Sequence, residues 1–208
     1  MGYKTVSGES KASFTEKKSE FIGHLIHVQS EDEAVAFIDR IRSENRKAKH
    51  NVYAYILREG NTSRYSDDSE PQGTAGVPVL EVLRKEGLTD VCCVVTRYFG
   101  GILLGTGGLA RAYTQAAKLA VGEARIKDMH RCREISFDCE YGLYGSVVNI
   151  LPKFGTKTLS SDFTDSVSIR LLCREEETDA FMSELTELSN GKIACVTSEL
   201  LYGDFSEG

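Results

Sequence analysis

The residues best suited to anion chemistry flank a glycine-rich segment in the middle of the chain. Glycine occupies five of the nine positions from 100 to 108, a density that indicates positive φ angles or a backbone that another group approaches closely. Two guanidinium groups beside free main-chain amides are suited to hold a phosphate group. The candidate anion-binding residues are Arg97, Gly100, Gly101, Gly105, Thr106, Gly107, Gly108 and Arg111.

The glycine-rich segment departs from the standard phosphate-binding motifs. No Lys-Ser or Lys-Thr pair follows the glycines as in a Walker A loop, and the spacing of a dinucleotide-binding loop is absent. A tightly packed connection whose arginines pair with nearby carboxylates explains the same residues. The spacing therefore leaves an anion site and a structural turn as alternatives.

A buried strand and a helix are expected to position these residues. Residues 91–95 form a continuous β-branched and thiol run, typical of a strand that is covered on both faces in the middle of a sheet. From Leu109, apolar residues recur with helical spacing as far as Gly122, which can end the helix. The glycine-rich segment should lie against the helix N-terminus, where unpaired amides and the helix dipole favour an anion.

A second loop, residues 65–76, carries carboxylates that could face the arginines. These acids could bind a hard cation through oxygen, or one of them could act as a general base. We favour a structural role over these two: the acids would cap a helix that starts near Thr74 and form salt bridges to the arginines, because Asp and Ser are common in caps and turns. The supporting loop residues are Asp67, Asp68, Glu70 and Thr74.

A basic cluster ends the helix that is expected after a capping box at residues 30–33. Cations are common near helix C-termini, so a solvated face that complements the helix dipole is favoured over a nucleic-acid contact. The candidate nucleic-acid patch comprises Arg40, Arg42, Arg46, Lys49 and His50.

Two domains of an α+β protein are predicted, at residues 1–128 and 129–208. The second part has strands and helices in the order βαββαβ, which is the ferredoxin-like arrangement. Residues 1–128 contain 18 Lys and Arg against 17 Asp and Glu, whereas residues 129–208 contain 7 against 14. Neither part is basic, so binding of a nucleic acid would need a local patch.

No cofactor, metal or membrane segment is expected. The six cysteines show no C-x-x-C spacing, and the four histidines form no helical metal-binding pair, so buried, reduced thiols are favoured. No apolar run reaches membrane-spanning length, and the N-terminus lacks the apolar core of a secretory signal. We therefore expect a cytoplasmic protein.

Residues 70–80, Glu-Pro-Gln-Gly-Thr-Ala-Gly-Val-Pro-Val-Leu, and residues 94–113, which include Arg-Tyr-Phe-Gly-Gly, closely resemble the YigZ/Impact family. Residues 18–22 and 48–51 fit earlier segments of the same family, and the likeness covers essentially the whole chain. One departure is Ser69, where the family usually has Gly before Glu-Pro.

The resemblance implies an N-terminal domain with the fold of the second domain of ribosomal protein S5. It also implies a ferredoxin-like C-terminal domain similar to the last domain of elongation factor G, and a link to translation. The eukaryotic relatives regulate initiation by competing for the activator of an initiation-factor kinase, through an additional N-terminal domain. Because that regulation depends on the additional domain, we do not carry it over to this chain.

The leading hypothesis is a non-catalytic, translation-associated regulator that binds RNA, the ribosome or another phosphate-bearing ligand through the glycine-rich segment. A protein partner from the translation machinery fits the acidic second domain. Two alternatives stay open: an enzyme acting on a phosphorylated small molecule or RNA, and a protein-interaction module with a purely structural glycine turn. No catalytic residue is assigned.

Overall fold

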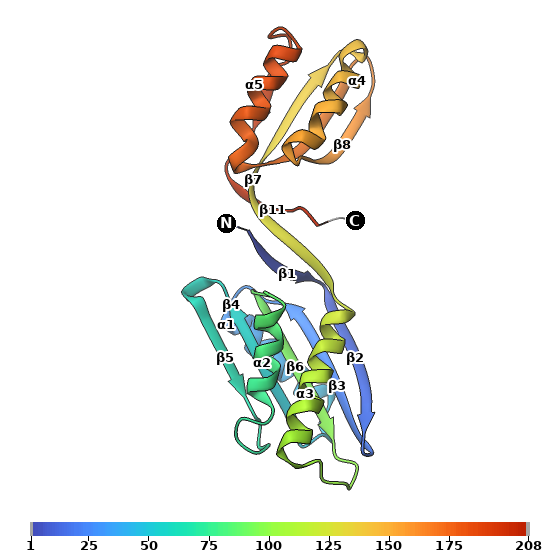
Figure 1. Ribbon diagram of the computed structural model, residues 1–208, viewed down its shortest axis with the longest axis vertical. Coiled ribbons are helices and arrows are strands. Elements are labelled where there is room, and N and C mark those ends of the chain that lie inside the picture. Colours follow the sequence, from blue (N-terminus) through green and yellow to red (C-terminus); the bar gives the residue numbers. More distant parts are fainter. Residues whose placement is uncertain (1, 207–208) are drawn as a thin grey trace. The chain divides into compact units, whose positions relative to one another are not determined.

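The computed structural model describes residues 2–206 and contains two compact units (Figure 1). Residues 3–127 form the first unit, and residues 128–206, together with Gly2, form the second. Each unit combines helices with a sheet built on antiparallel strand pairs. The two-domain α+β architecture predicted from the sequence is confirmed.

A five-stranded antiparallel sheet forms the centre of the first unit. The strand order is β2-β3-β6-β4-β5. The strands are β2 (Glu9–Glu16), β3 (Ser19–His27), β4 (His50–Leu57), β5 (Thr62–Ser66) and β6 (Val91–Tyr98), and a short strand, β1 (Tyr3–Ser7), precedes them. β6 is the middle strand and is buried from Val91 to Arg97, as its continuous apolar run predicts.

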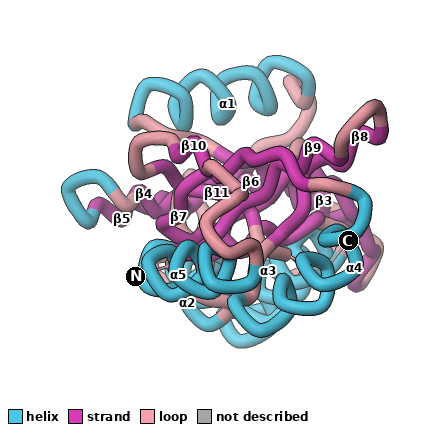
Figure 2. Tube along the Cα trace, turned by 90° about the horizontal axis from the view of Figure 1, so that it is seen from above, coloured by secondary structure: helices cyan, strands magenta, loops and turns pink. Residues whose placement is uncertain are grey.

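Helices cover both faces of this sheet (Figure 2). Helix α1 (Glu31–Glu44) packs on one face, and α2 (Gly76–Lys85) and α3 (Gly105–Gly122) pack on the other. Side chains alternate along each strand, so Phe21 and Leu25 of β3 join the core under α2 and α3, whereas Cys92 and Val94 of β6 join the core under α1.

The antiparallel register gathers distant segments at one end of the sheet. His50 at the start of β4 is opposite Arg97 near the end of β6, and Glu20 near the start of β3 is opposite Tyr98. The segments that meet there, which we call the loop end, are residues 17–18, 46–49, 67–75 and 99–104. The loop end lies at the bottom of Figure 1, where α3 also begins.

The second unit has the predicted βαββαβ order, followed by one further strand. Its elements are β7 (Arg125–Cys139), α4 (Tyr141–Ile150), β8 (Lys157–Phe163), β9 (Val167–Arg174), α5 (Thr178–Leu188), β10 (Cys195–Thr197) and β11 (Leu201–Asp204). β9 lies between β7 and β8, and β10 and β11 both pair with β7. Short 3₁₀ helices occupy Glu59–Asn61, Leu151–Phe154 and Glu175–Glu177.

Three elements differ from the sequence predictions. Helix α3 begins at Gly105 rather than at Leu109, because the glycine-rich segment itself forms the first helical turn. The segment after Leu200, which has no counterpart in the predicted βαββαβ order, pairs with residues 129–132 as β11. β5 was not expected, because this edge strand has mostly polar residues without apolar alternation.

Within residues 2–206, no helix combines the length and the apolarity that crossing a bilayer requires. All six cysteines are free thiols, and five are buried, as predicted. Burial raises the pKa of the Cys93 thiol to about 12, and that of the Cys173 thiol to about 11. These thiols therefore act as small apolar groups in the core.

His24 lies in the interior of β3, on the side of the sheet that α1 covers. It is 2% exposed, and neither ring nitrogen has a hydrogen-bond partner within the described chain. Its pKa is lowered to about 4, mainly by burial and also by the nearby charges of Lys11 and Arg40, although the carboxylates of Glu9 and Glu44 oppose the shift. His24 is therefore neutral at pH 7.

Acidification should destabilise the protein through His24. The unfolded chain protonates this histidine near pH 6.5 and the folded chain only near pH 4, so the free energy of unfolding falls as the pH drops through this window. Between pH 7 and pH 5 we expect this residue to account for about 2 kcal/mol. Urea unfolding of wild type and His24→Leu at both pH values measures the difference. An equal pH dependence in the two proteins would contradict the assignment.

Candidate functional site

The N-terminus of α3 is open at the loop end. The hydroxyl of Ser30 caps the N-terminus of helix α1 by accepting a hydrogen bond from the Glu33 amide. At α2, the Asp67 carboxylate accepts from the amides of Ala75 and Gly76. α3 has no side-chain cap in the described structure, so its first amides and the positive end of its dipole stay available.

Packing explains most, but not all, of the glycines before and in the first turn of α3. A Cβ atom at Gly100 would lie 1.9 Å from the Lys18 carbonyl oxygen, because the β2–β3 turn presses against this loop. Gly101 and Gly105 have positive φ angles of 85° and 70°. Gly107 has neither restriction, since the nearest atom to a Cβ there is a guanidinium nitrogen of Arg111 at 3.6 Å.

Arg97 is buried and paired with Glu70. Its Nη1 donates to Glu70 Oε1 at 2.6 Å, and the two side chains are 6% and 4% exposed. The Tyr113 hydroxyl donates to the same carboxylate oxygen at 2.8 Å. Burial, together with the Glu70 charge, raises the pKa of Tyr113, so its hydroxyl remains a donor. The expected salt bridge between the acidic loop and Arg97 is present.

The pairing with Glu70 leaves part of the Arg97 guanidinium without a partner. The Nε atom is buried and makes no hydrogen bond to any described residue. The guanidinium carbon lies 5.5 Å from the ring centres of both Phe21 and Phe99. A buried N–H donor without an acceptor is costly, so Arg97 carries an unsatisfied donor at the loop end.

His50 presents one ring nitrogen beside this pair. Its Nδ1 is 2.9 Å from the Asp68 carbonyl oxygen, and a carbonyl only accepts, so Nδ1 carries a hydrogen. The other nitrogen, Nε2, lies 4.0 Å from Glu70 Oε1. The ring is therefore oriented by the backbone, and Nε2 is the atom it offers to a ligand.

Arg97, His50 and the start of α3 line one pocket of about 430 Å³, which we call the His50 pocket. Its polar lining also includes Lys49, which forms no ion pair within the described residues. Phe99 and Leu103, which are 50% and 82% exposed, belong to its apolar lining. The complete lining is Lys49, His50, Ser69, Glu70, Pro71, Arg97, Phe99, Leu103, Leu104, Gly105, Thr106 and Leu109.

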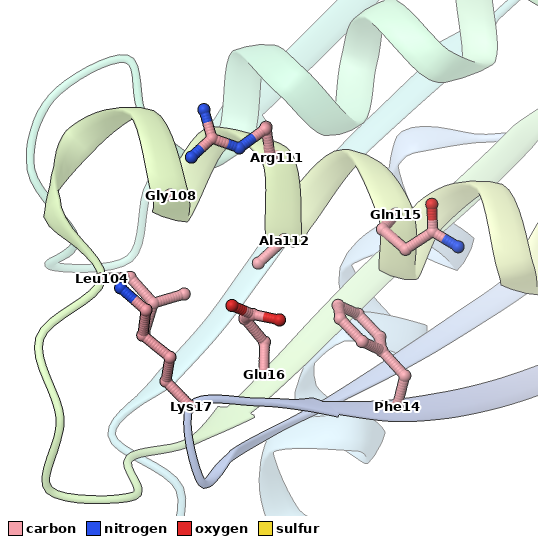
Figure 3. A pocket seen from close by; sticks show the side chains of 8 residues that line it. All are labelled: Phe14, Glu16, Lys17, Leu104, Gly108, Arg111, Ala112 and Gln115. Carbon is pink, nitrogen blue, oxygen red and sulfur yellow. The ribbon is translucent and has the colours of Figure 1, made fainter.

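Arg111 belongs to a different pocket of about 300 Å³, which we call the Phe14 pocket. Phe14 and Glu16 of β2 extend toward α3, from which Gln115 and Arg111 project (Figure 3). The complete lining is Phe14, Glu16, Lys17, Leu104, Gly108, Arg111, Ala112 and Gln115. The predicted binding residues Arg97 and Arg111 therefore line two pockets, and Leu104 is shared by both.

The acidic loop is occupied with structural hydrogen bonds. Besides capping α2, Asp67 accepts from the Gly73 amide, and Asp68 accepts from the Asn51 amide and from Arg42. The Thr74 hydroxyl donates to the Pro71 carbonyl. This is the capping arrangement that the sequence favours. No cluster of three or more His, Cys, Asp or Glu side chains within residues 2–206 is arranged to hold a metal ion.

The structure divides the basic cluster of residues 40–50 into two groups. Arg40 pairs with Glu9 and Glu44, and Arg42 pairs with Asp39 and Asp68. Arg46 and Lys49 have no ion pair within the described residues and, like Lys47, are exposed. Only the second group, with His50, is available to a ligand at the loop end.

Sequence reasoning missed Lys17, Phe14 and Leu103. Lys17 and Lys18 form the β2–β3 turn with positive φ angles of 46° and 64°, which are unusual for lysine. Two apolar alternating segments joined by Glu16-Lys17-Lys18 are typical of a hairpin. Its position against the glycine-rich loop depends on the pairing of β3 with β6, which local patterns do not specify.

Loss of the Glu70 charge should strongly destabilise the first unit. Glu70→Gln leaves the buried Arg97 cation without a counterion, so we expect the free energy of unfolding to fall by about 3 kcal/mol. Glu81→Gln is the matched control, because Glu81 pairs with Arg84 on the surface, where an ion pair contributes about 0.5 kcal/mol. Urea unfolding at pH 7 compares the two variants. Equal losses would contradict the role given to the buried pair.

Comparison with known proteins identifies both units. The Impact N-terminal domain family matches residues 17–121, and a domain family of unknown function, DUF1949, matches residues 137–192. IMPACT family member YvyE of Bacillus subtilis is 38% identical over 201 residues, covering 96% of this chain and 93% of that protein. IMPACT family member YigZ of Escherichia coli is 33% identical over 186 residues, covering 88% and 91%.

A solved structure supports the same assignment. The crystal structure of a protein described as hypothetical matches with a TM-score of 0.61 and 30% sequence identity, covering 95% of this chain and 98% of the other. The similarity therefore extends through both units, as the predicted resemblance requires. The chain belongs to the IMPACT family.

Proposed function

We propose that this protein is a translation-associated regulator that binds single-stranded RNA, with one phosphate group in the His50 pocket. The observation that carries the proposal is the buried Arg97, whose Nε donor has no partner within the described chain although Nη1 is paired with Glu70. This guanidinium lines the same pocket as Gly105 and Thr106 at the uncapped start of α3. A phosphate oxygen is an acceptor suited to both kinds of donor.

The charges around the His50 pocket support an anionic ligand. Glu70 is the single carboxylate of its lining, and Arg97 neutralises it. Lys49 adds a positive charge without an ion pair in the described structure, and His50 offers Nε2. The first part of the sequence is nearly neutral overall, so this local group of donors provides the patch that RNA binding requires.

The apolar part of the pocket supports a nucleotide over a bare phosphate. Phe99 and Leu103 leave large apolar surfaces exposed next to the anion donors. Bases of single-stranded RNA are unstacked and can pack on such surfaces, whereas a paired helix keeps its bases inside. The connection to translation rests on the family resemblance. Relatives named as IMPACT family members match most of this chain.

Reversal of the Lys49 charge should weaken RNA binding. For a fluorescein-labelled eight-nucleotide oligouridine, we expect Lys49→Glu to raise the Kd roughly tenfold at 50 mM salt and to reduce the salt dependence. Lys118→Glu is the matched control, since Lys118 is exposed on α3 and lies in neither pocket. Fluorescence anisotropy with the full chain at 50 and 200 mM salt provides the measurement.

The control variant should bind like wild type, and both variants should keep the wild-type melting temperature. Binding that does not weaken between 50 and 200 mM salt would contradict a phosphate contact. Equal effects of the two substitutions would place the RNA elsewhere on the surface.

A further inference from the structure

The two pockets at the loop end adjoin across the first turn of α3. Gly105 and Thr106 line the His50 pocket, Gly108 lines the Phe14 pocket, and the Leu104 side chain borders both. The helix N-terminus is thus a narrow ridge with a pocket on each side. A ligand longer than one nucleotide could pass over this ridge from one pocket to the other.

Nothing in the packing of the protein requires a glycine on that ridge at position 107. A Cβ atom there would make only an ordinary van der Waals contact with Arg111, and glycine is a poorer helix former than alanine. The missing side chain leaves the main chain of the ridge bare beside the Arg111 guanidinium. Close approach by the backbone of another molecule explains a glycine at such a position.

The Phe14 pocket contains the groups that recognise a nucleotide. Lys17 and Arg111 form no ion pair with any described residue, so both can contact a phosphate. Phe14 supplies an aromatic ring, which stacks on Phe21 at 5.5 Å on the protein side. Glu16 points its carboxylate toward α3 (Figure 3) and can accept a hydrogen bond from a base edge, and Gln115 also lines this pocket.

From these observations we propose that the Phe14 pocket is a second nucleotide subsite, and that one nucleic-acid strand occupies both pockets. This inference rests on the proposed function, because the first nucleotide lies in the His50 pocket. Arg111 contacts the phosphate that joins the two nucleotides over Gly107, and Lys17 contacts the next phosphate. The ligand is therefore an oligonucleotide rather than a free nucleotide.

The length of the ligand tests the second subsite. Calorimetric titration of the full chain compares uridine 5′-monophosphate with a four-nucleotide oligouridine. We expect the oligonucleotide to bind at least tenfold tighter than the mononucleotide. Arg111→Glu should weaken binding of the oligonucleotide roughly tenfold and leave the mononucleotide within twofold. Lys118→Glu, with the same change of charge on the same helix, should alter neither.

The possible failures of the two proposals are distinguishable. If the mononucleotide binds and the oligonucleotide binds no tighter, the second subsite is wrong and the proposed function stands. If neither ligand binds, both proposals are wrong. The subsite is overturned if Arg111→Glu binds the oligonucleotide as tightly as wild type does. It is also overturned if a paired RNA duplex binds as tightly as the four-nucleotide oligouridine. Tighter binding of a four-nucleotide oligothymidine than of the oligouridine supports the subsite but assigns it to single-stranded DNA.

Discussion

The buried ion pair between Glu70 and Arg97 is the interaction on which the loop end depends. It connects the acidic loop before α2 to the last buried position of β6, and Tyr113 adds a hydrogen bond from α3. Three segments that are distant in sequence are thereby joined at one carboxylate. A buried pair of this kind is stable only with good geometry and further hydrogen bonds, because both charges have left water. Here the Nε donor of Arg97 has no partner within the described chain, and the proposed phosphate site rests on this donor.

A series of side-chain contacts links the two pockets. Phe14 stacks on Phe21, the rings of Phe21 and Tyr113 meet in a T-shaped arrangement, and Tyr113 donates to Glu70. A continuous series of contacts thus runs from the Phe14 pocket to Arg97 through the core beneath α3. The same side chains therefore position both the aromatic rings and the ion pair of the loop end. This arrangement places the residues of the proposed site on helices and strands as well as on loops.

Local patterns predicted the elements of the site better than its geometry. The apolar run of β6 and the helical spacing from Leu109 to Gly122 identified the strand and the helix correctly, because both signals are local. The pairing of Glu70 with Arg97 was among the expected alternatives. The separation of Arg97 from Arg111 was not predictable, since it depends on which side of α3 each side chain occupies. The approach of His50 depends on the register of β4 with β6, and that of Lys17 on the pairing of β3 with β6, both of which are non-local.

On the proposed function, the unpaired Nε donor of Arg97 and the first amides of α3 receive negative charge from a ligand. Nuclear magnetic resonance of the ¹⁵N-labelled full chain observes these groups individually during titration with uridine 5′-monophosphate. The account predicts saturable shifts of the Arg97 Nε–H signal and of the amide signals of Thr106 and Gly107, with one common Kd. Unmoved signals at these three positions, while other residues respond, would contradict it.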